Sequence, residues 1–202
     1  MKIKDLMIPA PITITKKASI SEAIKVMKHN SIRHLPVVTP GKRLKGMVTL
    51  ADLKQGLIPS MVAGVTLADL MIKDIITVSP DSDIEIAARL IYKHKISGIP
   101  VLKKKLLVGI ITETDMLRAF IDMMGILTAS SRIDVRAKND TQGGFRKPFQ
   151  IINDSGGEVI NVGMANLQST GRIYYFRLTE CKTADICKAL KKSGFEVVSA
   201  TD

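Results

Sequence analysis

The stretch Gly46-Met47-Val48-Thr49-Leu50-Ala51-Asp52 has a second, related copy in Gly109-Ile110-Ile111-Thr112-Glu113-Thr114-Asp115. Both copies place Gly, an apolar pair, Thr and Asp at the same spacing, with a shift of 63 residues between them. Working outward, the matches at a shift of 64 are Pro36-Val37 with Pro100-Val101 and Leu6-Met7-Ile8 with Leu70-Met71-Ile72. The register holds with a single gap, so the sequence contains a duplicated unit of roughly 60 residues.

Each copy predicts the same order of elements, β-α-β-β-α. Extended β-branched segments at 12–14 and 76–78 lead into helices; Ser19 and Glu22 have the form of a capping box, and Asp83 is a plausible cap for the second helix. Apolar side chains at helical spacing predict one buried face on each helix, made of Ile20, Ala23, Ile24, Met27 and of Ile84, Ala87, Ala88, Ile91. The remaining predicted elements are strands at 35–38, 46–49, 99–102 and 109–112 and helices that open near Asp52 and Asp115. A unit of this size buries little surface alone, so we expect the two copies to pack as one pseudo-symmetric body.

Composition places the chain among globular proteins. Of 202 residues, 46% are hydrophobic and 24% charged, and the net charge of +11 favours phosphate-bearing partners in general. Two cysteines are too few for a disulfide framework. The longest apolar stretch, 56–72, is interrupted by Pro59 and Asp69, and the N-terminus has no signal-peptide pattern. We therefore expect a soluble cytoplasmic protein.

The paired Gly-x-x-Thr-x-x-Asp endings, the apolar-Pro-Val strands and the leading segments Asp5-Leu6-Met7 and Asp69-Leu70-Met71 resemble a tandem pair of CBS domains, the Bateman module. We place the first CBS domain at 1–62 and the second at 63–125. The resemblance implies an adenosyl ligand (AMP, ADP, ATP or an S-adenosyl compound) bound in clefts between the two copies.

The residue types fit that ligand. A carboxylate at Asp52 or Asp115 can accept hydrogen bonds from both ribose hydroxyls, and arginine suits a phosphate in geometry and charge. The nucleotide-binding residues implied by the resemblance are Ile12, Ile32, Arg33, His34, Met47, Thr49, Asp52, Ile76, Ile96, Ser97, Gly98, Ile110, Thr112, Thr114 and Asp115. The alternative for each Thr and Asp pair is that it only caps a helix.

The two copies differ inside this set. The second copy has Ser97-Gly98 where the first has Arg33-His34, and the first has Ala51 where the second has Thr114. We therefore do not expect two equivalent sites, and the sequence leaves open which cleft binds better.

The C-terminal part predicts a ferredoxin-like β-α-β-β-α-β domain after a linker at 126–131. Its predicted elements are strands at 133–137, 159–164, 173–178 and 195–199 and helices at 145–152 and 183–192. With Gly143 in the first loop and apolar Phe145, Ile151 and Ile152, residues 130–202 resemble an ACT domain. That resemblance implies a small effector, an amino acid or small acid, at Asp140, Thr141, Gln142 and Gly143. Thr141-Gln142 stands where Arg-Pro is common, so a role in pairing alone stays open.

Together these features predict an α/β (α+β) regulatory protein. The order of a CBS pair and an ACT domain resembles the acetoin-utilisation AcuB-like regulatory proteins. The sequence carries no P-loop, G-x-G-x-x-G, H-E-x-x-H or G-x-S-x-G motif, so we predict neither catalytic residues nor a metal or catalytic cofactor. We expect a non-catalytic homodimer that modulates an unidentified partner protein. The alternatives are a nucleic-acid binder, suggested by the charge, and a purely dimerising or structural module.

Overall fold

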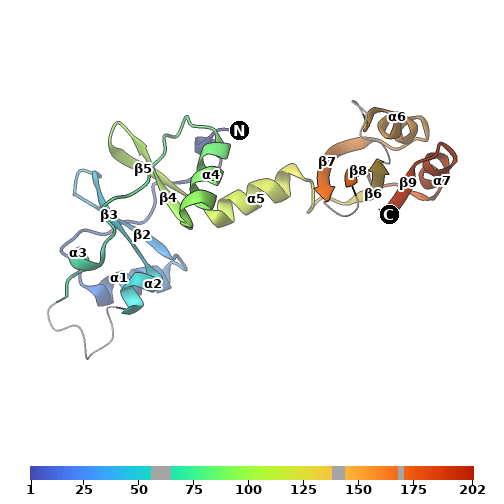
Figure 1. The fold of residues 1–202 in the computed structure, drawn as a ribbon. Coiled ribbons are helices and arrows are strands. Elements are labelled where there is room, and N and C mark those ends of the chain that lie inside the picture. The colour runs from blue at the N-terminus through green and yellow to red at the C-terminus, as the bar shows by residue number, and fades with distance from the viewer. Residues whose placement is uncertain (56–64, 138–143, 168–170) are drawn as a thin grey trace. The chain divides into compact units, whose positions relative to one another are not determined.

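The computed structural model describes residues 1–55, 65–137, 144–167 and 171–202. The chain divides into two compact units, Met1–Arg118 and Ala119–Asp202, and the boundary between them falls inside helix α5 (Glu113–Met123). Figure 1 shows the elements of each unit. The mixed α/β fold expected from the sequence is confirmed, and the two units are described separately below.

The first unit contains the two copies. Its elements are η1 (Ile3–Asp5), β1 (Ile8–Pro9), α1 (Ile20–His29), β2 (His34–Val38), β3 (Leu44–Thr49), α2 (Leu50–Gln55), α3 (Leu67–Leu70), α4 (Ile84–His94), β4 (Gly98–Lys103), β5 (Leu106–Thr112) and the start of α5. Strands β2 and β3 form one antiparallel pair and β4 and β5 the other. The extended segments add single parallel bridges, Ile14 with Val37 and Val78 with Val101. Each copy therefore has the predicted order of elements.

Helices α1 and α4 cover these hairpins with short apolar faces. The Ser19 hydroxyl accepts a hydrogen bond from the Glu22 N–H at 3.1 Å, which confirms the predicted cap of α1. In α4 the predicted face was right at Ala87 and Ile91 and wrong at Ala88, which is exposed; Leu90, which was not predicted, packs against the core beside them. Asp83 occupies the N-cap position of α4, but its side chain makes no capping hydrogen bond.

The segments that lead into the two copies are exchanged between them. Ile3 is completely buried, and it packs in a cluster with Val78, Ile99 and Ile111 of the second copy. Conversely Leu67, 1% exposed, packs in the cluster of the first copy. Each leading segment thus completes the core of the other copy, and the two copies form one body.

The exchange explains why Gly and Met recur in the repeat. Strand β1 pairs with β5, with Pro9 opposite Gly109, while Met47 and Ile72 exchange two backbone hydrogen bonds of 3.0 and 2.9 Å. A Cβ placed on Gly46 would lie 2.6 Å from the Met71 sulfur, and Gly109 faces the Met7 sulfur in the same way. The thioether of each leading segment therefore occupies the space that a side chain at Gly46 or Gly109 would fill.

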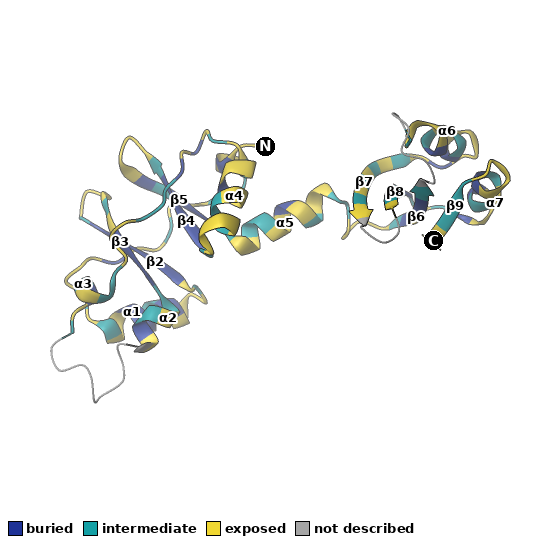
Figure 2. Ribbon diagram, viewed as in Figure 1, coloured by how far each residue is buried: buried dark blue, intermediate teal, exposed yellow. Residues whose placement is uncertain are grey.

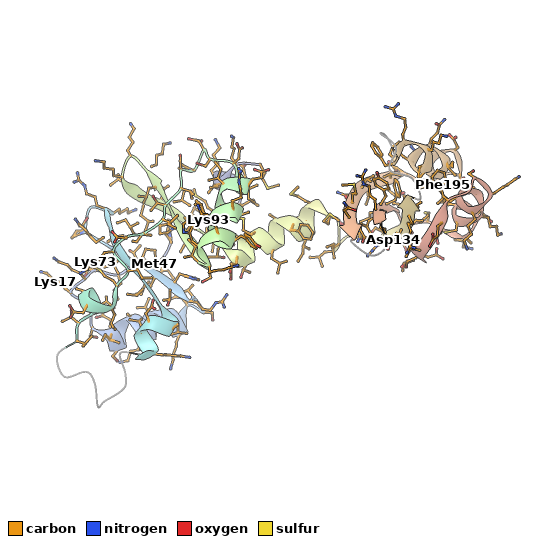
Figure 3. All side chains as sticks on the ribbon, in the orientation of Figure 1. Lys17, Met47, Lys73, Lys93, Asp134 and Phe195 are labelled. Carbon is orange, nitrogen blue, oxygen red and sulfur yellow. The ribbon has the colours of Figure 1, made fainter. Side chains whose placement is uncertain are left out.

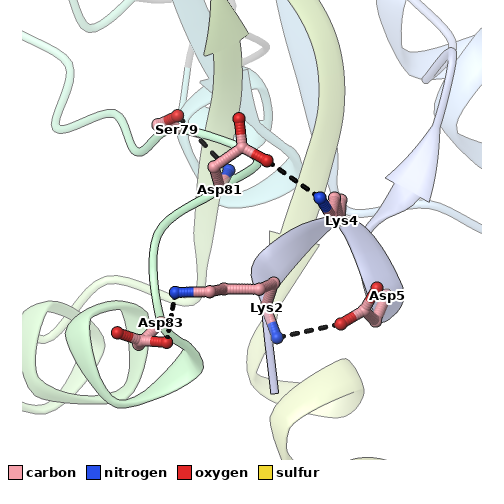
Figure 4. Close-up of polar contacts among 6 residues, drawn as sticks. All are labelled: Lys2, Lys4, Asp5, Ser79, Asp81 and Asp83. Carbon is pink, nitrogen blue, oxygen red and sulfur yellow. Dashed lines mark hydrogen bonds and ion pairs between the residues drawn. The ribbon is translucent and has the colours of Figure 1, made fainter.

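Polar contacts fix the position of the N-terminal segment on the second copy (Figure 4). Lys2 Nζ lies 2.8 Å from Asp83 Oδ1, and Lys4 Nζ lies 3.0 Å from Asp81 Oδ1. These hydrogen bonds raise the pKa of Lys2 and lower the pKa of both carboxyl groups. Exposed ion pairs contribute little stability. Their role is to position the N-terminal segment against residues 81–83, while Ile3 provides the buried contact.

The second unit is a four-stranded antiparallel sheet with two helices. Its elements are β6 (Ser130–Ala137), α6 (Arg146–Asp154), β7 (Val159–Leu167), β8 (Gly171–Thr179), α7 (Ala184–Lys192) and β9 (Glu196–Thr201). The strand order β7-β8-β6-β9 is the ferredoxin-like arrangement predicted from the sequence. Its core contains Ile133, Phe176 and Leu190, and Figure 2 shows buried residues on the strands and exposed ones on the outer surfaces of the helices.

The predicted linker was wrong at its end. Ser130 and Ser131 belong to β6, and Ser131 is fully buried. Its hydroxyl donates to the Cys181 carbonyl and accepts from the Cys181 N–H, both at 2.8 Å. A small polar residue is therefore part of the sheet here because both of its hydrogen-bonding functions are satisfied.

Candidate ligand-binding site

The Thr-x-x-Asp pairs cap helices. Thr112 N–H and Oγ1–H both donate to Asp115 Oδ2, at 2.8 and 2.7 Å. Thr49 and Asp52 repeat this geometry at 3.0 and 2.6 Å. These hydrogen bonds confirm the interpretation that each Thr and Asp pair caps a helix. The cap uses one carboxylate oxygen, Oδ2, and a carboxylate has a second oxygen, so capping does not prevent the acid from accepting ligand hydroxyls.

A third pair has the same motif and the same cap outside the repeat register. Thr66-Leu67-Ala68-Asp69 has the same four residues as Thr49-Leu50-Ala51-Asp52. Thr66 N–H and Oγ1–H donate to Asp69 Oδ2 at 2.9 and 2.6 Å. What distinguishes the three carboxylates is their surroundings.

Asp115 lies beside a hollow of about 230 Å³ built from both copies. The second copy contributes polar groups at the start of α5, and the first contributes the segment before β2. The lining residues are Ile8, Ser31, Ile32, Arg33, His34, Ile110, Thr112, Thr114 and Asp115. The structure thus brings together seven of the predicted residues. The sequence analysis missed Ile8 and Ser31; the signal for Ile8 was its repeat at Ile72, because Ile8 pairs with Ile110 as Ile72 pairs with Met47.

A second hollow, of about 370 Å³, lies beside Thr49. It is lined by Arg33, His34, Thr49, Leu50, Ala51, Lys54 and Ser97. Leu50, Ala51 and Lys54 were not predicted, and Lys54 could have been found one turn into the helix that opens near Asp52. Arg33 and His34 line both hollows. The residues at the start of β2 therefore border both hollows.

Six predicted residues line neither of these two hollows among the described residues, namely Ile12, Met47, Asp52, Ile76, Ile96 and Gly98. Met47 is 6% exposed and its backbone pairs with Ile72; Figure 3 labels it within the first unit. Ile12 is 40% exposed. Asp52 has the same cap as Asp115 but does not line the hollow next to it. Equivalent sequence positions thus have unequal surroundings.

His34 and Gly98 explain the difference between the copies. They occupy equivalent positions of the repeat and lie against each other, since a Cβ placed on Gly98 would be 3.1 Å from two ring carbons of His34. His34 Nε2 and Ser97 Oγ share a hydrogen bond of 2.7 Å. The contact is tight, so the histidine of one copy favours glycine at the equivalent position of the other. Burial of the ring, reinforced by Arg33, lowers the pKa of His34, which is therefore uncharged at pH 7.

The predicted effector loop of the second unit, Asp140, Thr141, Gln142 and Gly143, lies outside the described residues. Within the described ranges, no group of three or more His, Cys, Asp or Glu side chains is placed to hold a metal ion. In the same part of the chain, no helix combines the length and the apolar character needed to cross a membrane.

The profile of the CBS domain family matches residues 3–58 and 67–122, more than half of the chain. The chain therefore belongs to the CBS domain family, as a tandem pair. Among curated proteins it is similar to the L-aspartate semialdehyde sulfurtransferase of Methanocaldococcus jannaschii, with 33% identity over 119 residues, 58% of this chain and 23% of that protein. The chain spans about a quarter of the length of this relative.

The solved structures that resemble the chain include three that bear on its ligand or its family. The CBS domain pair of protein MJ0100, in complex with 5′-methylthioadenosine and S-adenosyl-L-methionine, is 32% identical with a TM-score of 0.56, covering 59% of this chain and 95% of that one. A putative acetoin utilization protein (AcuB) from Vibrio cholerae is 32% identical with a TM-score of 0.57, covering 62% and 94%. CBSX2 in complex with AMP is 27% identical with a TM-score of 0.53, covering 60% and 96%.

Proposed function

We propose that this chain is a non-catalytic regulatory sensor that binds an adenosyl ligand in the hollow beside Asp115. The observation that carries the proposal is the composition of that hollow. It combines a carboxylate, three hydroxyl side chains, an arginine and isoleucines from both copies around one space.

Each group has a matching part of the ligand. Asp115 accepts hydrogen bonds from the ribose hydroxyls, and Ile32 and Ile110 form apolar walls for the adenine. Arg33 offers a guanidinium to phosphate, or to the carboxylate of an S-adenosyl amino acid. Because residues of both copies surround one ligand, binding would stabilise one packing of the copies over others, which is the requirement for a sensor.

The relatives support the ligand class. The similar CBS pair of MJ0100 is described with two adenosyl compounds, and CBSX2 with AMP. The catalytic activity named for the sulfurtransferase does not carry over, since this chain spans 23% of that protein. The likeness to the AcuB structure supports a role in acetoin utilisation. The homodimer, the regulated partner, the ACT assignment with its small effector, the domain boundaries and the cytoplasmic location remain predictions.

Thermal melting with AMP, ATP and S-adenosylmethionine tests the proposal. A ligand at about a hundred times its dissociation constant adds about 2.7 kcal/mol to the free energy of unfolding. Asp115→Asn should abolish this gain, whereas Asp69→Asn, which weakens an equivalent cap outside the hollow, should keep it. If none of the three ligands raises the melting temperature, the proposal is wrong. Stabilisation by single-stranded DNA alone would support the nucleic-acid alternative.

A further inference from the structure

The two β-hairpins of the first unit carry cations where their strands turn (Figure 1). The turns lie side by side, because the Leu107 N–H donates to the Lys42 carbonyl at 3.0 Å and Arg43 forms a β-bridge with Leu106. Five exposed cations therefore gather at one place, which we call the basic tips. They are Lys42 and Arg43 of the β2–β3 hairpin and Lys103, Lys104 and Lys105 of the β4–β5 hairpin.

The charge of the basic tips is not neutralised within the chain. Neither hairpin, residues 34–49 or 98–112, contains Asp or Glu. Among the residues that the structure describes, none of the five cations takes part in an ion pair. Lys4 and, more weakly, Lys103 lower the pKa of Asp81, but that carboxylate already pairs with Lys4 at 3.0 Å. The basic tips thus present positive charge to solvent.

The backbone of the turns does not explain these lysines. Lys104 and Lys105 are the two central residues of a tight turn, since Lys103 pairs with Leu106, and their φ angles are 49° and 68°. A two-residue turn with positive φ at both positions strongly prefers Asn-Gly. Lys42 also has a left-handed φ, of 58°, a conformation that favours glycine. Lysine therefore stands at three positions where the backbone favours another residue, and its charge is the property that those residues lack.

The chemistry of the basic tips favours a polyphosphate partner. Leu106, 40% exposed, is the one large apolar side chain exposed at 39–43 and 103–106, whereas the centre of a protein interface is apolar and poor in lysine. Neither hairpin has the Phe, Tyr or Trp on which the bases of a single strand stack. Thr39 is the one neutral polar side chain in these two turns, so the 2′-hydroxyls of an RNA duplex would meet few partners. These features match the phosphates of duplex DNA.

We propose that the basic tips bind the sugar-phosphate backbone of double-stranded DNA without reading its bases. A DNA duplex carries one negative charge per about 1.7 Å of its axis, so one small surface meets several phosphates. This inference does not rest on the proposed adenosyl function, because none of the five cations lines either hollow.

Fluorescence anisotropy of a labelled DNA duplex, titrated with the full chain between about 50 and 200 mM salt, tests the inference. If all five cations contact phosphates, the logarithm of the binding constant falls with the logarithm of salt concentration with a slope of about −4.5. The double variant Lys104→Gln, Lys105→Gln should make the slope shallower by about 1.8 and weaken binding about tenfold or more near 0.1 M salt. Lys16→Gln, Lys17→Gln is the matched control, because it removes the same charge from another exposed turn and should change binding much less.

A second variant separates charge from folding. Lys104→Asn, Lys105→Gly gives the turn its preferred residues, so we expect a higher melting temperature together with the same loss of DNA binding. A lower melting temperature, or DNA binding as in the natural chain, would overturn the inference. Equal losses in the control variant would show that only the net charge matters. Tighter binding to a single strand or to duplex RNA than to duplex DNA would also contradict it, as would binding to vesicles of anionic lipid but not to DNA.

Discussion

The exchange of leading segments makes a prediction about where a mutation acts. Ile3 has no exposed surface and contacts the cluster of Val78, Ile99 and Ile111, so Ile3→Ala removes three carbons from a filled space. Such truncations cost about 2–5 kcal/mol, which is a large share of the roughly 5–15 kcal/mol that stabilises a domain. Urea denaturation should measure a loss in that range. Ile12→Ala, at a residue 40% exposed, is the control and should cost less than about 1 kcal/mol.

Hydrogen exchange shows which copy loses protection. Although Ile3 precedes the first copy, Ile3→Ala should speed amide exchange in β4 and β5 of the second copy more than in β2 and β3. Leu67→Ala should do the opposite, because Leu67 packs in the cluster of the first copy. A loss below about 1 kcal/mol for Ile3→Ala, or faster exchange confined to β2 and β3, would refute the exchange of segments.

Three further predictions concern single side chains. The pKa of His34 is lowered by burial and by Arg33, against the smaller opposing effects of Glu113 and Asp52, so the unfolded state binds a proton near pH 6.5 that the folded state does not. The free energy of unfolding, measured by urea titration, should therefore fall as the pH drops from 7.5 to 5.5. His34→Asn should reduce this dependence on pH. If the variant shows the same dependence as the natural chain, the burial of a neutral His34 does not cause it. Gly98→Ala should lower the free energy of unfolding by about 1–3 kcal/mol, because the added methyl group contacts the His34 ring. Adding His34→Ala to this variant should recover part of that loss. If the losses of the two single variants simply add in the double variant, the two residues do not interact. Burial raises the pKa of the Cys187 thiol, so iodoacetamide should label it more slowly at pH 8 in the folded chain than in urea, and equal rates would contradict this.

Local patterns predicted the elements well. The register of the repeat located both hairpins, because each strand and helix carries its own signal in a few neighbouring residues. The order of elements after residue 130 was sufficient to predict the ferredoxin-like sheet. At Ala88 and Ser131 a local pattern failed because tertiary packing decided which side chains are buried.

Contacts between the copies could not be predicted from the order of the chain. The repeated Leu-Met-Ile segments precede their copies, and nothing local shows that Ile3 packs in the second copy and Leu67 in the first. The same limit applies to the site. Asp52 and Asp115 have the same motif and the same cap, but only Asp115 lines a hollow completed by Arg33 and Ile8. Ser97 and Gly98 differ in sequence from the equivalent pair of the first copy, Arg33 and His34. In the structure both of them contact the His34 ring.

A crystal structure of the chain with bound adenosine tests the central claim most directly. The account predicts one nucleoside in the hollow formed by Ile32, Ile110 and Asp115, with its ribose hydroxyls about 2.5–3.2 Å from the Asp115 carboxylate while Thr112 still donates to Oδ2. Adenosine bound beside Asp52 instead, or bound with its ribose away from both acids, would contradict it.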